Sequence, residues 1–236
     1  SPLGQPLLAM DIGSPEWTRL IVDGAAALGV ALRPDHVRLF ARHAVELLKW
    51  NAVTNLTAVT RPEEVARNHF LDSLAPARLI TAGSSLLDVG SGGGFPGLPL
   101  HIALDGLQTT LIDAVRKKVS FLRHVARTLA LSGVAAEQQR IEEFANNSAG
   151  RRSFDVITSR AFSAMAPFVR AAWPLLRPEG RIIAFKGDIP AAEMDGLQAV
   201  VASGGLGKGI VLEQVAYTLP GLRRERALLI VSRKGG

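Results

Sequence analysis

The sequence predicts an α/β fold in which a mostly parallel, seven-stranded sheet follows an N-terminal helical extension. From residue 84 onward, short apolar runs alternate with stretches of helical periodicity, which is typical of a parallel sheet with helices on both faces. Residues 15–80, in contrast, carry apolar residues at helical spacing throughout. We therefore expect a flexible tail over residues 1–14, the helical extension over 15–82 and the sheet domain over 83–236.

Three helices are predicted in the extension. Ser14–Glu16 resembles an N-cap followed by proline at the first helical position. Asp35 opens a second helix with an apolar stripe formed by Val37, Phe40, Ala44 and Leu47. The segment Thr60–Glu63 fits a capping box, and it starts a third helix that we expect to run to about Leu79.

Six apolar runs in the second part are predicted strands, and a further strand should end near residues 138–140. The runs cover residues 86–89, 109–113, 154–158, 181–185, 209–212 and 227–231. Residues 115–131 carry an apolar stripe at helical spacing. The last two runs are joined by a loop too short for a crossover helix, so we expect an antiparallel hairpin at one edge of the sheet.

Composition excludes several classes of protein. The 236 residues are 47% hydrophobic and 20% charged, which is enough to bury a substantial core. No run reaches the ~18 apolar residues of a membrane span, so we expect a soluble, cytoplasmic protein without membrane contact. The absence of cysteine excludes disulfides, thiolate metal sites and cysteine nucleophiles. The five histidines lack metal-ligand spacing, and we expect no metal.

The charge balance favours an anionic partner. Lysine and arginine number 27 against 21 acidic residues, which gives a net charge of +6, and the isoelectric point is near 10.3. Nucleic acid is the first candidate for such a surface. Basic clusters occur at residues 116–118, 151–152 and 223–226.

The richest motif is the glycine loop over residues 87–97, which follows a predicted strand and precedes a helix. In an α/β sheet this is where ligands bind, since glycine lets the backbone approach a ligand closely. Gly92, Gly94 and Gly97 satisfy GxGxxG, which by itself is weak evidence. Asp88 precedes the first glycine, where dinucleotide folds usually carry an apolar residue. Asp113 ends the next strand, where it can accept both hydroxyls of a ribose.

Acids at both strand ends fit a ligand that combines an amino acid with adenosine, and S-adenosylmethionine has that shape. The next strand is followed by Glu142, which could accept from the adenine amine but equally suits the first turn of a helix. The fourth strand ends in Ser159–Phe162. Adenine-N6 methyltransferases commonly carry a D/N/S-P-P-Y/F motif at this place, and this sequence reads Ser-Arg-Ala-Phe instead. Methylation at pyrimidine C5 needs a cysteine nucleophile, and the sequence has none. An acceptor atom with a free lone pair and no proton to lose therefore remains, and guanine N7 is such an atom.

An ordered set of blocks strongly resembles the bacterial glucose-inhibited division protein B family, the small-subunit rRNA guanine-N7 methyltransferases. The resemblance covers roughly residues 35–232. Its blocks are Asp88–Pro99, Leu111–Asp113 with Arg116–Leu122, Trp50–Asn51, Asn55–Thr57, Asn68–Ser73, Arg140–Glu143, Phe154–Phe162 and Phe185–Gly187.

This resemblance implies a Rossmann-like class I methyltransferase fold, S-adenosyl-L-methionine as cofactor, and a guanine of a decoding-region stem-loop in 16S rRNA as substrate. The partner is then the small-subunit rRNA or the small ribosomal subunit, and we expect a monomer. The implied cofactor contacts, together with those predicted from the motifs, are Asp88, Gly90, Gly92, Phe95, Asp113, Ile141, Glu142 and Arg160. The implied RNA contacts are Asn55, His69, Asp72, Arg140 and Lys186, and the candidate catalytic residues are Arg160, Lys186, Arg140 and His69.

Three other functions stay open at this point. A methyltransferase acting on a small molecule would share the fold and cofactor, although the arginine excess argues against it. A nicotinamide-dependent oxidoreductase would explain the three glycines, but Asp88 and the lack of an obvious Tyr-Lys pair count against it. A non-catalytic binder in ribosome assembly could retain an old cofactor pocket, although a decayed pocket should have lost some of Asp88, Asp113 or Arg160.

Overall fold

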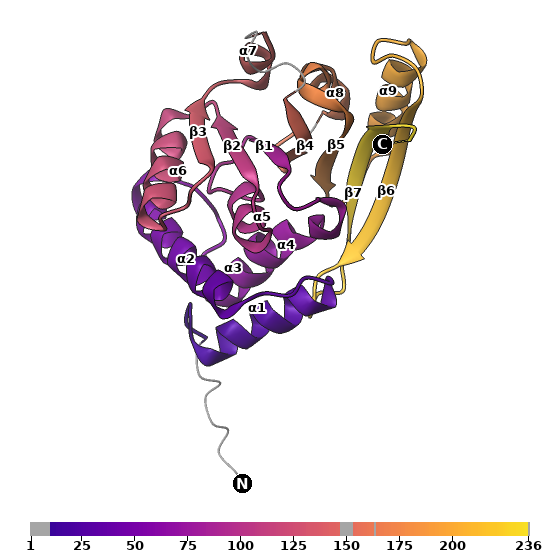
Figure 1. Ribbon diagram of the computed structural model, residues 1–236. Coiled ribbons are helices and arrows are strands. Elements are labelled where there is room, and N and C mark those ends of the chain that lie inside the picture. The colour runs from indigo at the N-terminus through magenta and orange to yellow at the C-terminus, as the bar shows by residue number, and fades with distance from the viewer. Residues whose placement is uncertain (1–9, 147–152, 163, 236) are drawn as a thin grey trace.

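The computed structural model describes residues 10–146, 153–162 and 164–235. A single seven-stranded sheet of order β3-β2-β1-β4-β5-β7-β6 lies between two layers of helices (Figure 1). The strands are β1 (Ser85–Val89), β2 (Gln108–Asp113), β3 (Val134–Gln138), β4 (Phe154–Ser159), β5 (Leu176–Lys186), β6 (Ile210–Thr218) and β7 (Glu225–Arg233).

The predicted sheet is confirmed. The five strands β1 to β5 are parallel, and β7 pairs antiparallel with both β5 and β6. The two edge strands form the expected hairpin, whose turn lies at the carboxyl end of β5 because Lys186 pairs with Ala227. The carboxyl ends of β1, β2, β4 and β5 and the hairpin turn therefore meet at one edge of the sheet.

The helices of the first layer come mainly from the N-terminal part of the chain. They are α1 (Pro15–Ala27), α2 (Pro34–Thr54), α3 (Pro62–Val65), α4 (Asp72–Leu74), α5 (Gly97–Ala103) and α6 (Arg116–Thr128). One hydrophobic cluster joins this layer to the sheet: Phe40 and Phe70 of the N-terminal helices and Leu111 of β2 all belong to it. The predicted extension is thus packed into the core of the sheet domain.

The second layer covers the opposite face. It contains α7 (Ile141–Asn146), α8 (Met165–Ala172), the short 3-10 helix η4 (Trp173–Leu175) and α9 (Ala191–Ala202). Phe168 of α8 and Leu197 of α9 are buried in a second hydrophobic cluster. The same cluster contains side chains from this face of the strands, such as Ile157 of β4 and Ile182 of β5. The central strands β1, β2 and β4 are therefore buried on both faces, as parallel sheets require, whereas the edge strands β3 and β6 are partly exposed.

The helix starts were only partly predicted. Ser14 caps α1 as expected, because its Oγ accepts from the Trp17 amide at 3.2 Å. The predicted capping box at residues 60–63 is wrong: Arg61 occupies the N-cap position, and its side chain makes no capping hydrogen bond. Within the predicted tail, residues 1–9 lie outside the described residues, and Met10 and Ile12 pack partly buried against the core.

The predicted third helix is not a continuous α-helix. After α3, the chain widens into a π-helical segment, η1 (Ala66–Leu71), before the short α4 and the 3-10 helix η2 (Ala77–Leu79). Such π-helical insertions are rare and often occur at functional sites. Here the insertion brings Asn68 and Asp72 towards the carboxyl edge of the sheet, where they contact Arg160, directly after β4, and Arg226 of the edge hairpin.

Among the described residues, no helix is long and apolar enough to cross a membrane. Over the same ranges, no group of three or more His, Cys, Asp or Glu side chains is placed to hold a metal ion.

Candidate active site

The glycine loop after β1 is held down by backbone hydrogen bonds. The amides of Gly90 and Ser91 both donate to the Ile112 carbonyl, at 2.8 and 3.1 Å. Gly90 has a φ of +71°, and a Cβ added there would lie 2.6 Å from the Cβ of Ala161. The loop therefore requires glycine at residue 90 for both its backbone conformation and its close approach to the segment after β4.

Asp88 supports this loop from below. Its carboxylate is fully buried and accepts from the Gly97 amide at 3.1 Å and from the Thr158 hydroxyl at 2.9 Å. Burial raises the pKa of Asp88 to about 6, against the opposing effect of these donors. The sequence placed Asp88 among the cofactor contacts, whereas the structure places its side chain beneath the loop, where it ties β1 to the start of α5 and to β4.

Asp113 lies at the end of β2, as predicted, and faces the glycine loop. One carboxylate oxygen accepts from the Gly92 amide at 2.9 Å, and the other accepts from the Val115 amide at 2.9 Å. The side chain is 6% exposed. Because each carboxylate oxygen can accept more than one hydrogen bond, Asp113 retains acceptor capacity towards the cavity that it lines.

A cavity of about 270 Å³ opens beside the loop at the ends of β1 and β2. The predicted residues Gly90, Asp113, Ile141 and Glu142 all line it, together with Arg140. Its remaining walls are Val89, Ala114, Lys118, Gln139, Ala161 and Phe162. The structure thus brings four of the predicted cofactor contacts to one cavity, whose lining includes Gly90 and the carboxylates of Asp113 and Glu142.

Phe95 occupies a different place from its neighbours in the loop. Its ring is 7% exposed and stacks against His43 and His69, with ring centroids 4.8 and 4.5 Å away. The Nε2–H of His43 donates to the Gly93 carbonyl at 2.7 Å. The Nδ1 atom is therefore an acceptor, and no described residue donates to it. Burial lowers the pKa of His43 to about 4. The Phe95 ring therefore anchors the loop to α2 and η1 rather than lining the cavity.

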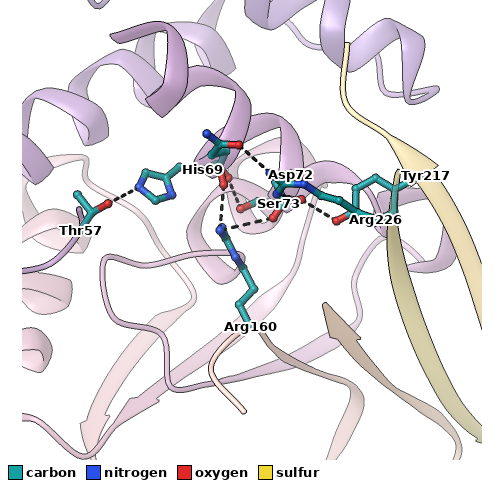
Figure 2. A network of polar contacts seen from close by, with 8 residues as sticks. Thr57, His69, Asp72, Ser73, Arg160, Tyr217 and Arg226 are labelled. Carbon is teal, nitrogen blue, oxygen red and sulfur yellow. Dashed lines mark hydrogen bonds and ion pairs between the residues drawn. The ribbon is translucent and has the colours of Figure 1, made fainter. Parts of the chain in front are cut away.

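On the acceptor side of the edge, Asp72 is the centre of a buried polar network (Figure 2). Its carboxylate is 3.5 Å from an Nη of Arg160 and 2.9 Å from an Nη of Arg226, and it accepts from the Tyr217 hydroxyl at 2.6 Å. Burial and the negative charge of Asp72 raise the pKa of Tyr217 above its ordinary value, so this hydroxyl stays protonated and donates.

Asn68 links both arginines of this network to η1. Its carbonyl accepts from Arg160 at 2.9 Å, and its side-chain oxygen accepts from Arg226 at 2.8 Å. The second terminal nitrogen of Arg160, Nη1, is buried and has no hydrogen-bond partner among the described residues. A buried guanidinium nitrogen without an acceptor is costly, and it marks a place where a further acceptor would be stabilised.

Next to this network, a second cavity of about 210 Å³ has a strongly basic lining. Arg160, Lys186, Arg224 and Arg226 contribute four cationic side chains, and Asp72 is the one carboxylate in the lining. Lys186 donates to the Phe162 carbonyl at 2.9 Å and to the Glu193 carboxylate at 2.6 Å. The segment Arg160–Phe162 therefore separates the two cavities, with Arg160 on the basic cavity and Phe162 on the other.

His69 lies deeper than its predicted RNA-contacting role required. Its Nε2 is hydrogen-bonded to the Thr57 hydroxyl at 2.7 Å, and the ring is 9% exposed. Burial and the nearby Arg160 charge lower the pKa of His69 to about 3, so the ring is neutral near pH 7. Asn55 is exposed at the end of α2, and Arg140 is exposed at the end of β3; the structure brings neither into the basic cavity.

Sequence reasoning missed three residues of this site: Asn68, Tyr217 and Arg226. Asn68 stood in a block that the family resemblance singled out, and Arg226 belonged to a basic cluster. Tyr217 is the single tyrosine of the chain, and no motif around it points to this site. Their partners lie about 150 residues away, and only the hairpin turn beside the carboxyl end of β5 brings them together.

Comparisons with known proteins agree with this geometry. The family model described as GidB, rRNA small subunit methyltransferase G, matches residues 36–214. A protein of Geobacter metallireducens named ribosomal RNA small subunit methyltransferase G is 44% identical over 215 residues, covering 91% of this chain and 96% of the relative. A protein of the same name from Cupriavidus pinatubonensis is 41% identical over 228 residues, covering 92% and 94%.

The fold itself is shared with solved methyltransferase structures. An O-methyltransferase from Bacillus cereus in complex with SAH superposes with a TM-score of 0.58 at 18% identity, covering 82% of this chain and 91% of that protein. A putative S-adenosyl-L-methionine-dependent methyltransferase from Methanococcus maripaludis gives a TM-score of 0.52 at 16% identity, covering 84% and 88%.

Proposed function

The chain belongs to the GidB family, rRNA small subunit methyltransferase G, and from that premise and the site geometry we propose that it transfers a methyl group from S-adenosyl-L-methionine to N7 of a guanine in the decoding-region stem-loop of 16S rRNA. The observation that carries this proposal is the pair of cavities on either side of residues 160–162. One has the backbone and carboxylate of a nucleoside site, and the other has the basic lining of a nucleic-acid site.

The residues of the first cavity fit S-adenosylmethionine. The backbone of Gly90 forms part of the cavity wall without a side chain, and the Asp113 carboxylate can accept from ribose hydroxyls. Ile141 supplies an apolar wall for the adenine, and Glu142 opens α7 beside it as an acceptor for the exocyclic amine. When bound, this cofactor supplies an electrophilic methyl group on a sulfonium sulfur.

The basic cavity is suited to orienting a guanine and the phosphate next to it. Arg160 and Arg226 present guanidinium groups, and an arginine can donate to guanine O6. N7 must stay free of any donor, because its lone pair is the attacking group. We place Arg160 and Lys186 at the reacting end, since both line this cavity beside the segment shared with the cofactor cavity.

No residue has to act as a strong base for this acceptor. Guanine N7 carries no proton, so the protein contributes orientation and proximity rather than proton removal. The neutral ring of His69 therefore serves the site by packing against Phe95 and bonding Thr57. Methylation leaves the guanine ring positively charged, and the carboxylates of Asp72 and Glu193 offset the surrounding cations.

Recognition should involve a base that is exposed or flipped, because the deep major groove of A-form RNA hides N7. We expect Asn55, Asp72 and Arg140 to contribute to the RNA side of the cleft, Asp72 through the two arginines that it holds. We further propose that the protein acts as a monomer in the cytoplasm, on the small subunit or its rRNA.

Transfer of labelled methyl groups tests this proposal. Purified protein is incubated with S-adenosylmethionine carrying a labelled methyl group and with small ribosomal subunits from cells that lack the modification. The rRNA is then digested, and the labelled nucleoside is identified. Label in 7-methylguanosine is the expected result. Label in another nucleoside, or in no RNA although the cofactor binds, contradicts the proposed acceptor.

A further inference from the structure

The exposed face of α6 carries a row of arginines outside both cavities. Arg116, Arg123 and Arg127 are all exposed, and Ser120 lies between them on the same side of the helix. Their spacing of four, three and four residues places them in one line, because an α-helix repeats every 3.6 residues. The row is about 16 Å long at the helical rise of 1.5 Å per residue. The helix contains no acidic residue.

These three arginines lack a carboxylate partner, as do isolated exposed arginines such as Arg19 and Arg78, but only here do such arginines follow one another along one helix face within the described residues. Within the described residues, none of the three forms an ion pair, whereas Arg33, Arg38, Arg61, Arg177 and Arg224 all do. The nearby carboxylates are already engaged. Glu46 of α2 contacts His124 and Lys49, and Glu137 of β3 accepts from the Gln139 amide.

The arrangement is electrostatically unfavourable for the protein alone. Arg116, Lys117 and Lys118 occupy the first turn of α6, where the helix dipole disfavours cations. Arg123 is also fixed in place, because its Nε donates to the Ala136 carbonyl at 2.9 Å and leaves the terminal nitrogens free to bind. A row of positioned cations without counter-charges is expected where the protein binds a polyanion.

The row is continuous with the cofactor side of the site. Helix α6 begins three residues after Asp113, and Lys118 of its first turn lines the cofactor cavity. In Figure 1, α6 lies at the outer margin of the sheet beside β3, so its exposed face is open to a large ligand. From the first turn, the row leads away from the site towards the opposite edge of the sheet, where α2 contacts the end of α6.

We propose that the row Arg116–Arg123–Arg127 binds phosphate groups of the RNA that flanks the target guanine. This inference rests on the proposed function, and it adds a second contact surface to the basic cavity. Guanidinium groups pair with phosphate oxygens in two-pronged hydrogen bonds, and successive phosphates along a strand match a linear row of such groups. The contacts fix the position of the RNA without reading its sequence.

The test is a triple substitution, R116Q/R123Q/R127Q, measured on whole small subunits and on naked 16S rRNA transcripts at several salt concentrations. Glutamine keeps an unbranched, polar side chain with similar helix propensity, and the triple variant removes three charges. We expect binding at 0.1 M salt to weaken on the order of tenfold to a hundredfold, and the slope of log affinity against log salt to fall by about 3. The rate at saturating RNA and the affinity for S-adenosylmethionine should match those of the wild type.

A matched control is R19Q/R78Q/R170Q, which removes the same charge from exposed arginines of α1, η2 and α8 that, like those of the row, form no ion pair within the described residues. This control should retain wild-type RNA affinity and salt slope. Equal loss of RNA affinity in both triple variants would overturn the α6 inference, because it would indicate an effect of net charge alone. No loss of RNA affinity in either variant would also overturn it. Loss on subunits but not on naked RNA would also overturn it, in favour of an acidic protein partner. A wild-type protein that binds cofactor but methylates no RNA would instead overturn the proposed function.

Discussion

The two halves of the active-site edge are built by different means. On the cofactor side, neighbouring segments of the chain supply backbone amides, glycines and a single carboxylate at the ends of β1 and β2. On the acceptor side, four side chains converge from α4, the segment after β4 and the edge hairpin: Asp72, Arg160, Tyr217 and Arg226. The first half is a local backbone construction, whereas the second is a buried charge network that depends on the whole fold.

This difference has consequences for robustness. A backbone site tolerates most side-chain changes but not added volume at its glycines. A buried charge network fails when one member is removed, because its partners are left charged and without compensation. The comparison therefore predicts that side-chain substitutions damage stability most on the acceptor side, and that Cβ additions damage ligand binding most on the cofactor side.

Removal of the Asp72 charge should have the largest effect. In Asp72→Asn, Arg160 and Arg226 lose their shared carboxylate in a site where Asp72 is 3% exposed. We expect the free energy of unfolding to fall by about 3–5 kcal/mol, as for other broken buried ion pairs. Chemical denaturation at pH 7 measures this loss. A change below about 1 kcal/mol would show that the network is not a closed, mutually dependent unit.

The dependence of the free energy of unfolding on pH below 7 tests two buried groups that hold the glycine loop, His43 and Asp88. The folded state depresses the pKa of His43 from 6.5 to about 4, so its contribution is present above pH 6.5 and is lost as the pH falls through about 4. This contribution amounts to about 3 kcal/mol at 1.36 kcal/mol per pKa unit. Asp88, with a raised pKa of about 6, acts in the opposite direction and contributes stability at low pH that is lost as the pH rises through 6.

Comparison of His43→Gln with the wild type from pH 7.5 to pH 4 isolates the histidine. The amide of glutamine can still donate to the Gly93 carbonyl but does not titrate. The stability difference between the two proteins should therefore shift in favour of the variant by about 3 kcal/mol as the pH falls. Parallel curves would contradict the assignment of His43 as a neutral, buried group.

Adding a Cβ at Gly90 and at Gly83 separates the effect of backbone strain from the effect of a steric clash. Gly90→Ala introduces both a strained positive φ and a contact of 2.6 Å with Ala161, so we expect a loss of about 2–3 kcal/mol in stability and at least tenfold weaker cofactor binding. Gly83→Ala is the matched control, since Gly83 has a φ of +78° and no atom within 4 Å of the added Cβ. It should lose only about 1–2 kcal/mol and bind cofactor normally.

Tyr217→Phe should have the smallest effect of the series. It removes one hydrogen bond to Asp72 but leaves both arginines in place. We expect about 1–2 kcal/mol of destabilisation, near the value for a hydrogen bond to a charged group, with unchanged cofactor affinity. Calorimetric titration and thermal unfolding together measure both quantities. A loss as large as that of Asp72→Asn would mean that the hydroxyl, not the arginines, holds the carboxylate.

The same contrast explains what the sequence could predict. The strand–loop–helix around residues 86–103 and the aspartate at the end of β2 are contiguous patterns, and the structure has them as expected. The burial of the Phe95 ring could not be predicted, because its neighbour His43 lies on α2, about 50 residues earlier in the chain. Tyr217 and Arg226 were missed because no local pattern reveals that an edge hairpin turns beside a π-helical segment.

The most direct test of the two-part site compares cofactor affinity with methyl transfer in two variants, Asp113→Ala and Lys186→Ala. Asp113 lines the cofactor cavity and Lys186 lines the basic one. Calorimetric titration with S-adenosylmethionine should show weakened binding in Asp113→Ala and wild-type binding in Lys186→Ala, while methyl transfer to small subunits falls in both. An equal loss of cofactor affinity in the two variants would contradict the division of the site into a cofactor half and an acceptor half.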